Sequence, residues 1–157
     1  MSIVLVRVDD RLVHGQVVVG WGQALGATRV ALVDDDVRAN SWEQELYELG
    51  MPPGLALEFA SVPEAAERVP EWLESKDKVI VLVGGVDTLA RLCHASADID
   101  CVNVGGLHDA TGRRQRLPYV YLSDEEVATL AGLAGDGVRV TAQDLPTAKP
   151  IPIEGLQ

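Results

Sequence analysis

Residues able to take part in phosphoryl chemistry follow the first apolar run of the chain. The run Ile3–Val8 ends in Asp9 and Asp10, and a cation and an imidazole follow at Arg11 and His14. A neutral imidazole, with an ordinary pKa of about 6.5, is a nucleophile near pH 7. A guanidinium neutralises phosphate oxygens. The pattern predicts that His14 accepts a phosphoryl group, that Arg11 binds it, and that Asp10 fixes the ring or Arg11.

A helix is expected directly after this loop, over residues 14–25. Apolar residues recur there with helical spacing, at Val17, Trp21, Ala24 and Leu25. The first amides of a helix have no partner within it and attract anions, and α/β folds place ligands where strands meet helices. Gly15 and Gln16 are therefore candidate phosphate ligands.

Composition and charge limit the kind of protein that this chain can be. The 157 residues hold 47% apolar residues, enough for one folded domain with a core. The formal net charge of −11 argues against nucleic acid as a partner. No apolar run approaches the roughly 20 residues that span a bilayer, and no leader pattern opens the chain. We expect a soluble cytoplasmic protein.

Strand and helix patterns alternate along the chain. This alternation predicts a single α/β domain over residues 1–157, with a mostly parallel, twisted open sheet of about six to seven strands and helices on both faces. Residues 143–157, with three prolines, are expected to form an extended tail. Strands are expected at 3–8, 29–33, 55–60, 78–83, 99–104, 117–122 and 138–142. Further helices are expected at 40–49, 61–75, 86–95 and 123–134.

Four loops are expected to converge at the carboxyl edge of this sheet, namely 9–14, 34–36, 84–88 and 105–109. Parallel strands end at one edge, so these loops form the walls of the candidate site. Backbone amides of two adjacent glycines form an anion nest when their geometry allows it. Besides the first loop, the candidate phosphate-binding and loop residues are Gly84, Gly85, Asp87, Thr88, Asn103, Gly105 and Gly106.

The first loop also resembles the active-site loop of a known family. The run Arg7-Val8-Asp9-Asp10-Arg11-Leu12-Val13-His14-Gly15-Gln16-Val17, with Trp21, is similar to the motif of mannose/fructose/sorbose-type enzyme IIB proteins of the bacterial sugar phosphotransferase system. The run Asn103-Val104-Gly105-Gly106-Leu107 is similar to a second segment of that family.

The resemblance implies a phosphocarrier. A phosphohistidine enzyme IIA would donate to His14, and His14 would pass the group to a sugar bound by the membrane enzymes IIC and IID. It implies no cofactor and no metal, and peripheral association with the inner face of the membrane through IIC and IID. The sugar and the oligomeric state stay open.

Particular residues bear on alternative functions. After the fourth strand, the run Val83-Gly84-Gly85-Val86-Asp87-Thr88 lacks a polar side chain that many family members have before the Asp. A regulatory phosphocarrier that moves no sugar therefore stays an alternative. A receiver-type signalling domain is rejected, because it needs an Asp where Ala60-Ser61 stand and a Lys where Gly105-Gly106 stand. Cys93, His94, Cys101 and His108 are not expected to bind a metal, because Cys101 lies in a core-like run.

Overall fold

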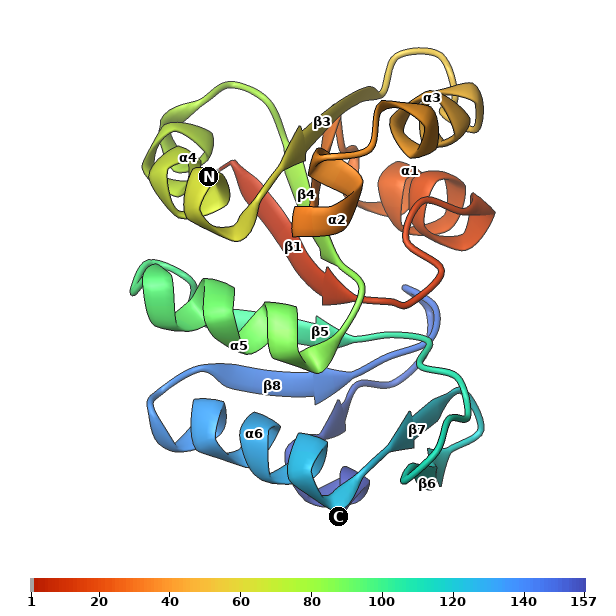
Figure 1. Cartoon of the computed structure of the whole chain (residues 1–157), viewed down its shortest axis with the longest axis vertical. Coiled ribbons are helices and arrows are strands. Elements are labelled where there is room, and N and C mark those ends of the chain that lie inside the picture. The colour runs from red at the N-terminus through yellow and green to blue at the C-terminus, as the bar shows by residue number, and fades with distance from the viewer. Residues whose placement is uncertain (1) are drawn as a thin grey trace.

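The computed structural model describes residues 2–157 and contains a seven-stranded sheet (Figure 1). The strand order is β3-β2-β4-β1-β5-β8-β9. All neighbouring pairs are parallel except β8 and β9, which are antiparallel. The strands of the sheet are β1 (Ile3–Val8), β2 (Arg29–Val33), β3 (Ala56–Ala60), β4 (Val79–Val83), β5 (Cys101–Val104), β8 (Arg139–Ala142) and β9 (Ile151–Pro152). A separate antiparallel hairpin joins β6 (Arg114–Leu117) to β7 (Val120–Leu122).

Helices cover both faces of the sheet, as expected, and the α/β class is confirmed. One apolar cluster joins the sheet to α4 (Val62–Glu74), α5 (Val86–Ala95) and α6 (Asp124–Gly135). The other cluster joins it to the π-helical turn η1 (Gln16–Trp21), α2 (Asp35–Arg38) and α3 (Ser41–Leu49). The short α1 (Gly22–Leu25) continues η1, and the 3-10 turn η2 (Ile153–Leu156) ends the chain. In Figure 1, α5 runs in front of β5, and α6 lies below β8.

The core explains why the strands read as continuous apolar runs. All five residues of β4 are buried, because helices cover this central strand on both faces. Helices begin where the sequence predicts capping boxes, at Ser61 with Glu64 and at Ser123 with Glu126. Among the described residues, no helix is long and apolar enough to cross a bilayer.

Four local differences from the expected elements appear. The first helix starts at Gln16 as a π-helical turn, and the acidic run after β2 forms the unexpected helix α2, capped by Asp34. The strand expected at 117–122 is interrupted by a turn at Pro118 and Tyr119, so that residues 114–122 form a hairpin. In the tail, residues 151–156 form β9 and η2, and Leu156 is buried, so this part is not a free extended segment.

Candidate functional site

The loop after β1 is fixed by backbone hydrogen bonds to its neighbours. The amide of Asp9 donates to the carbonyl of Val83 at 2.9 Å, and the amide of Asp10 donates to the carbonyl of Gly106 at 3.0 Å. These bonds tie the loop to the ends of β4 and β5, at the carboxyl edge where ligands of α/β folds bind. The convergence of loops expected there is observed for the first loop, the loop after β4 and the loop after β5.

Leu12 holds the loop in an unusual backbone conformation. It has a φ of 59°, in the left-handed region that side chains rarely adopt, and its side chain is buried. A Cβ at Gly84 would lie 3.2 Å from Cδ2 of Leu12. Glycine at position 84 thus leaves room for the side chain of Leu12, whose burial anchors the loop. This packing role of Gly84 differs from the anion nest that was expected.

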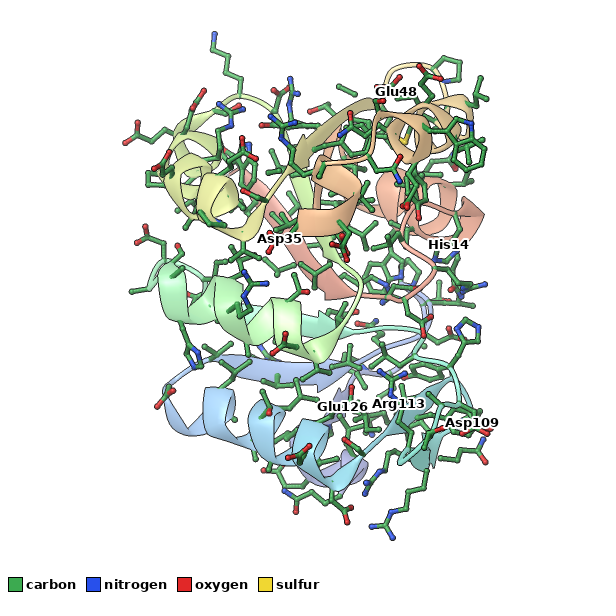
Figure 2. The ribbon with its side chains drawn as sticks, in the orientation of Figure 1. His14, Asp35, Glu48, Asp109, Arg113 and Glu126 are labelled. Carbon is green, nitrogen blue, oxygen red and sulfur yellow. The ribbon has the colours of Figure 1, made fainter. Side chains whose placement is uncertain are left out.

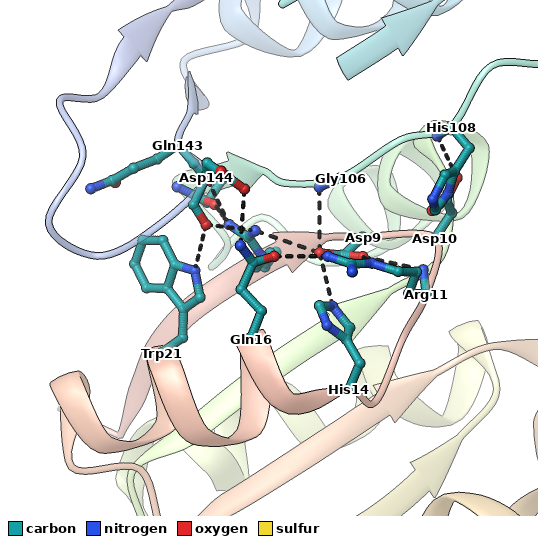
Figure 3. Close-up of polar contacts among 12 residues, drawn as sticks. Asp9, Asp10, Arg11, His14, Gln16, Trp21, Gly106, His108, Gln143 and Asp144 are labelled. Atoms are coloured by element: carbon teal, nitrogen blue, oxygen red, sulfur yellow. Dashed lines mark hydrogen bonds and ion pairs between the residues drawn. The ribbon is translucent and has the colours of Figure 1, made fainter. Parts of the chain in front are cut away.

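His14 faces a buried carboxylate. Its Nε2 lies 3.1 Å from Oδ2 of Asp9, and the side chains are 15% and 0% exposed (Figure 3). The two atoms lie within hydrogen-bonding distance, but within residues 2–157 Nε2 makes no aligned hydrogen bond. A carboxylate at this distance favours the tautomer with its proton on Nε2, which leaves the lone pair of Nδ1 as the nucleophile.

Asp9 is held by groups from three segments. Its Oδ1 accepts from the amide of Arg11 at 3.1 Å, and its Oδ2 accepts from the amide of Gly106 at 3.4 Å and from Nη2 of Arg7 at 3.5 Å. The ring-orienting role expected of Asp10 therefore falls geometrically to Asp9. A carboxylate with so many fixed partners cannot turn away from the ring.

The buried side chain of Arg7 holds Asp9 from the interior of the protein. It is fully buried, donates to Oδ1 of Asn103 and the carbonyls of Gln143 and Asp144, and lies 5.0 Å from the centre of the Trp21 ring. Asn103, expected among the phosphate-binding residues, thus contacts Arg7 instead. A buried guanidinium needs these partners, because an unpaired buried charge is very costly.

The two glycines after β5 allow this packing. A Cβ at Gly105 would lie 2.3 Å from the guanidinium of Arg7, so only glycine fits there. At Gly106 a Cβ would lie 3.6 Å from both carboxylate oxygens of Asp9. Gly105 therefore lets the backbone approach Arg7, whereas a Cβ at Gly106 would make an ordinary contact. The amide of Gly106 is directed to Asp9 rather than to an open phosphate pocket.

Arg11 lies at the open side of the site. Its side chain is 47% exposed, its Nε lies 3.8 Å from Oδ1 of Asp9, and its Nη2 donates to Oε1 of Gln16 at 2.8 Å. Nε2 of Gln16 donates in turn to Oδ1 of Asp144 at 3.0 Å. Arg11 is thus linked to both Asp9 and the first residue of η1, with room to bind an anion.

Asp10 points away from His14. Its Oδ1 lies 2.6 Å from Nδ1 of His108, and its Oδ2 accepts from the amide of His108 at 2.7 Å (Figure 3). The expected contact of Asp10 with the ring of His14 or with Arg11 is wrong for this structure. Asp9 directly follows β1, whereas Asp10 lies in the turn after it, and the two side chains face different partners.

The remaining candidate residues surround the site less closely. Gly15 precedes η1 and is exposed, whereas the amides of Val17 and Val18 both donate to the carbonyl of His14 at 3.0 Å. Only the amides ahead of Val17 are thus open to an anion at the helix start. Asp87 and Thr88 lie in the first turn of α5, and within residues 2–157 no hydrogen bond or ion pair joins them or Gly85 to the side chain of His14.

Electrostatics favour a neutral imidazole. Burial lowers the pKa of His14 from its ordinary value of 6.5, the charge of Asp9 opposes this, and the charges of Arg11 and Arg7 lower the pKa further. The ring is therefore unprotonated, and nucleophilic, near pH 7. A half-exposed guanidinium beside it can neutralise the oxygens of an arriving phosphoryl group.

Three residues of the site were missed as functional residues by the sequence reasoning. Arg7 had a signal, because a charged residue inside the buried strand β1 needs a partner. The sequence does not show which of Asp9 and Asp10 faces the ring of His14, because this depends on where β1 ends. Asp144 left no signal: its carbonyl accepts from Nε1 of Trp21 at 3.2 Å, which brings the C-terminal segment to the helix of the first loop (Figure 3).

The other candidate ligands lie apart from His14. His94 is exposed near the end of α5, at the edge of the sheet opposite to His14. Cys93 is buried, whereas Cys101 is exposed, so the expected core position of Cys101 is wrong. Within residues 2–157, no three His, Cys, Asp or Glu residues gather in a way that could hold a metal ion.

Comparisons with known proteins agree on one family. The model of the PTS system sorbose subfamily IIB component matches residues 3–156. The N-acetylgalactosamine-specific phosphotransferase enzyme IIB component 1 of Escherichia coli (strain K12) is 30% identical over 146 residues, covering 92% of each chain. The mannose-specific EIIAB component of the same strain is 28% identical over 150 residues, which are 94% of this chain and 46% of that one.

A solved structure supports the same relationship. The crystal structure of the N-acetylgalactosamine-specific IIB component 1 of E. coli matches with a TM-score of 0.88 and 29% identity, over 95% of this chain and 97% of that one. The chain belongs to the sorbose subfamily of phosphotransferase-system IIB components.

Proposed function

We propose that the protein takes a phosphoryl group onto Nδ1 of His14 from a phosphohistidine of enzyme IIA and passes it to a sugar bound by enzymes IIC and IID. Members of its family are transferases of a sugar-uptake system. The contact between Nε2 of His14 and Asp9 carries the proposal, because it leaves Nδ1 as the free nucleophile of a partly exposed ring.

The first transfer needs few groups of this chain. The lone pair of Nδ1 attacks phosphorus while the bond from phosphorus to the donor nitrogen breaks, and the electron pair of that bond returns to the donor ring. Asp9 balances the positive charge that the ring of His14 gains, and Arg11 neutralises the phosphate oxygens. Positioning and charge supply the catalysis, so no cofactor is invoked.

The second transfer runs in reverse at the same nitrogen. A sugar hydroxyl oxygen forms a bond to phosphorus as the bond from phosphorus to Nδ1 breaks, and the hydroxyl proton is released. The ring of His14 then returns to its neutral form, which its burial and the charges of Arg11 and Arg7 favour. We assign Gly15 and Gln16, at the start of η1, to the binding of the phosphoryl oxygens together with Arg11.

The mannose-specific EIIAB relative supports enzyme IIA as the donor, because its name joins an A and a B component in one protein. The membrane partners and a peripheral position at the membrane follow from the family role. The regulatory alternative rested on the glycines after β4. The contact of Gly84 with Leu12 gives that glycine a structural reason, so no observation now favours the alternative.

Reconstituted transfer tests the proposal. The protein is incubated with the general phosphotransferase proteins, enzyme IIA, labelled phosphoenolpyruvate, and vesicles that contain enzymes IIC and IID, over a panel of sugars. We expect labelled sugar phosphate with the wild-type protein and none with His14→Ala. Sugar phosphate formed at the wild-type rate by His14→Ala would refute the role of His14.

A further inference from the structure

Helix α3 exposes a stripe of large apolar side chains, Trp42, Leu46 and Leu49. They are 68%, 50% and 83% exposed, and their spacing of four and three residues puts them on one side of the helix. None of the nine residues of α3 is buried. Scattered apolar residues are normal on protein surfaces, but a contiguous stripe that includes a tryptophan is typical of an interaction site.

The stripe is held firmly on the body of the protein. Nε2 of Gln44 donates to the carbonyls of Val37 and Arg38 at 3.0 and 2.9 Å, and the side chain of Asn40 caps the helix by accepting from the amide of Glu43. Tyr47 packs on the opposite side of the helix, into the apolar cluster of the sheet. The apolar stripe is therefore a fixed outer surface.

This surface belongs to the side of the protein that presents His14. Tyr47 packs into the same apolar cluster as Val17 and Trp21 of η1, the helical turn that begins two residues after His14. In Figure 2, Glu48 of α3 and His14 both lie on the side of the molecule that carries α1 and α3. A partner that reaches His14 from this side meets the stripe as well.

The negative charge near the stripe indicates the charge that a partner surface should carry. Helix α3 carries three carboxylates, Glu43, Glu45 and Glu48, and no cation. In the preceding α2, Arg38 is paired with Glu64 and Asp35 with Arg91, each at 2.9 Å. Glu45 and Glu48 of α3 are exposed. A complementary surface is thus apolar at its centre and basic at its rim, because matched charges steer association and like charges oppose it.

Three kinds of occupant differ in charge. An anionic lipid surface is repelled by the carboxylates. A second copy of this chain, packed about a two-fold axis, would place the same acidic surfaces against each other. Loops on the cytoplasmic side of membrane proteins carry an excess of Lys and Arg, which is the sign that the stripe requires.

We propose that Trp42, Leu46 and Leu49 dock the protein onto basic cytoplasmic loops of its membrane-embedded partner. The inference rests on the proposed function, in which enzymes IIC and IID form that partner. Docking through α3 brings the side of the protein that carries His14 toward the bound sugar, so the proposal assigns the stripe to the second transfer.

The test compares the two transfers in one triple variant, Trp42→Gln with Leu46→Gln and Leu49→Gln. Glutamine is compatible with a helix and these side chains are exposed, so the fold is retained. With vesicles that contain IIC and IID, the concentration of the variant needed for half-maximal formation of sugar phosphate should rise by about tenfold or more. The rate of His14 phosphorylation by enzyme IIA should be unchanged.

A matched control and a charge variant complete the design. Ala128→Gln, on the exposed side of α6 and on the other face of the sheet, should behave as wild type in both transfers. Glu45→Lys with Glu48→Lys should also raise the half-maximal concentration, and added salt should raise it for the wild type and reduce the difference between the two proteins.

Several results would overturn the docking proposal. An unchanged half-maximal concentration for the triple variant would do so, as would slower phosphorylation by enzyme IIA alone, which would assign the stripe to that protein. Equal binding to vesicles without IIC and IID would assign it to lipid, and a wild-type dimer that the variant loses would assign it to a second copy. Absence of sugar phosphate with the wild type would instead refute the second transfer of the proposed function, and the docking role with it.

Discussion

Oδ2 of Asp9 lies 3.1 Å from Nε2 of His14, and the carboxylate is fully buried while the ring keeps part of its surface exposed. The buried Arg7 and the amides of Arg11 and Gly106 hold that carboxylate. The site is therefore a fixed series of contacts from Arg7 through Asp9 to His14. It orients the ring before any phosphoryl group arrives, so little reorganisation is needed for transfer.

Asp9→Asn should show whether the carboxylate of Asp9 acts on the ring of His14. The change removes the only carboxylate beside both Arg7 and His14 among residues 2–157, so the pKa of His14 should fall further below 6.5 and the rate of its phosphorylation should drop by about tenfold or more. The free energy of unfolding should fall by about 3–5 kcal/mol, because the buried Arg7 loses the carboxylate with which it is paired.

Measurement of both effects uses nuclear magnetic resonance titration of His14 and urea unfolding. Asp10→Asn is the matched control, since Asp10 contacts His108 and not His14. Its His14 should titrate as in the wild type. A wild-type pKa of His14 in Asp9→Asn would show that the carboxylate does not act on the ring.

Gly105→Ala should displace the buried guanidinium of Arg7 and thereby destabilise the protein. The new Cβ would lie 2.3 Å from the guanidinium of Arg7, and the side chain has no free space to move into because it is fully buried. We expect a loss of about 1–3 kcal/mol in the free energy of unfolding. Gly132→Ala, in α6 with nothing within 4 Å, should instead stabilise the protein by about 0.4–1 kcal/mol. Equal urea midpoints for the two variants would contradict the close packing at Gly105.

Arg11→Lys should slow phosphoryl transfer without unfolding the protein. Lysine keeps the charge but loses the planar fork that binds two phosphate oxygens at once, so we expect a rate lower by about tenfold. Arg114→Lys is the control, because Arg114 is 71% exposed in the hairpin β6–β7. The check is the initial rate of labelling by enzyme IIA, with urea midpoints measured alongside. A wild-type rate for Arg11→Lys would remove Arg11 from the mechanism.

Stability should depend on pH through His14. Its pKa is lowered in the folded state, chiefly by burial, so at pH values between the folded pKa and about 6.5 the unfolded chain binds more protons. The free energy of unfolding should therefore rise with pH across this window and level off above it. The difference between wild type and His14→Gln, measured by urea unfolding from about pH 5 to about pH 7.5, isolates this contribution. A difference that falls as pH rises would mean that Asp9 outweighs burial.

Much of the fold could be predicted from the sequence because its signals are local. The continuous apolar run of β4 and the capping boxes at Ser61 and Ser123 define elements without reference to distant residues. The hairpin at 114–122 was less visible, since a turn at Pro118 and Tyr119 interrupts a run that reads as one strand. The π-helical turn η1 depends on a hydrogen-bond pattern that apolar spacing does not reveal.

The site was predictable only in part, because its contacts are long-range. The motif indicates His14 and Arg11, but the choice between Asp9 and Asp10 depends on which of two neighbouring side chains faces the ring. Asp144 lies 128 residues from Gln16 in sequence and meets it only in the fold. Contacts of this kind follow from the packing of β8 and its following segment beside β1 and β5, which no local pattern encodes.

The position of the phosphoryl group tests the central claim most directly. The protein is phosphorylated by enzyme IIA, and the linkage is identified by nuclear magnetic resonance of ¹⁵N-labelled histidine side chains, with peptide mapping to locate the residue. The structure predicts a single phosphohistidine, at Nδ1 of His14, because Nε2 faces Asp9. A phosphoryl group on Nε2 of His14, or on His94 or His108, would contradict the account.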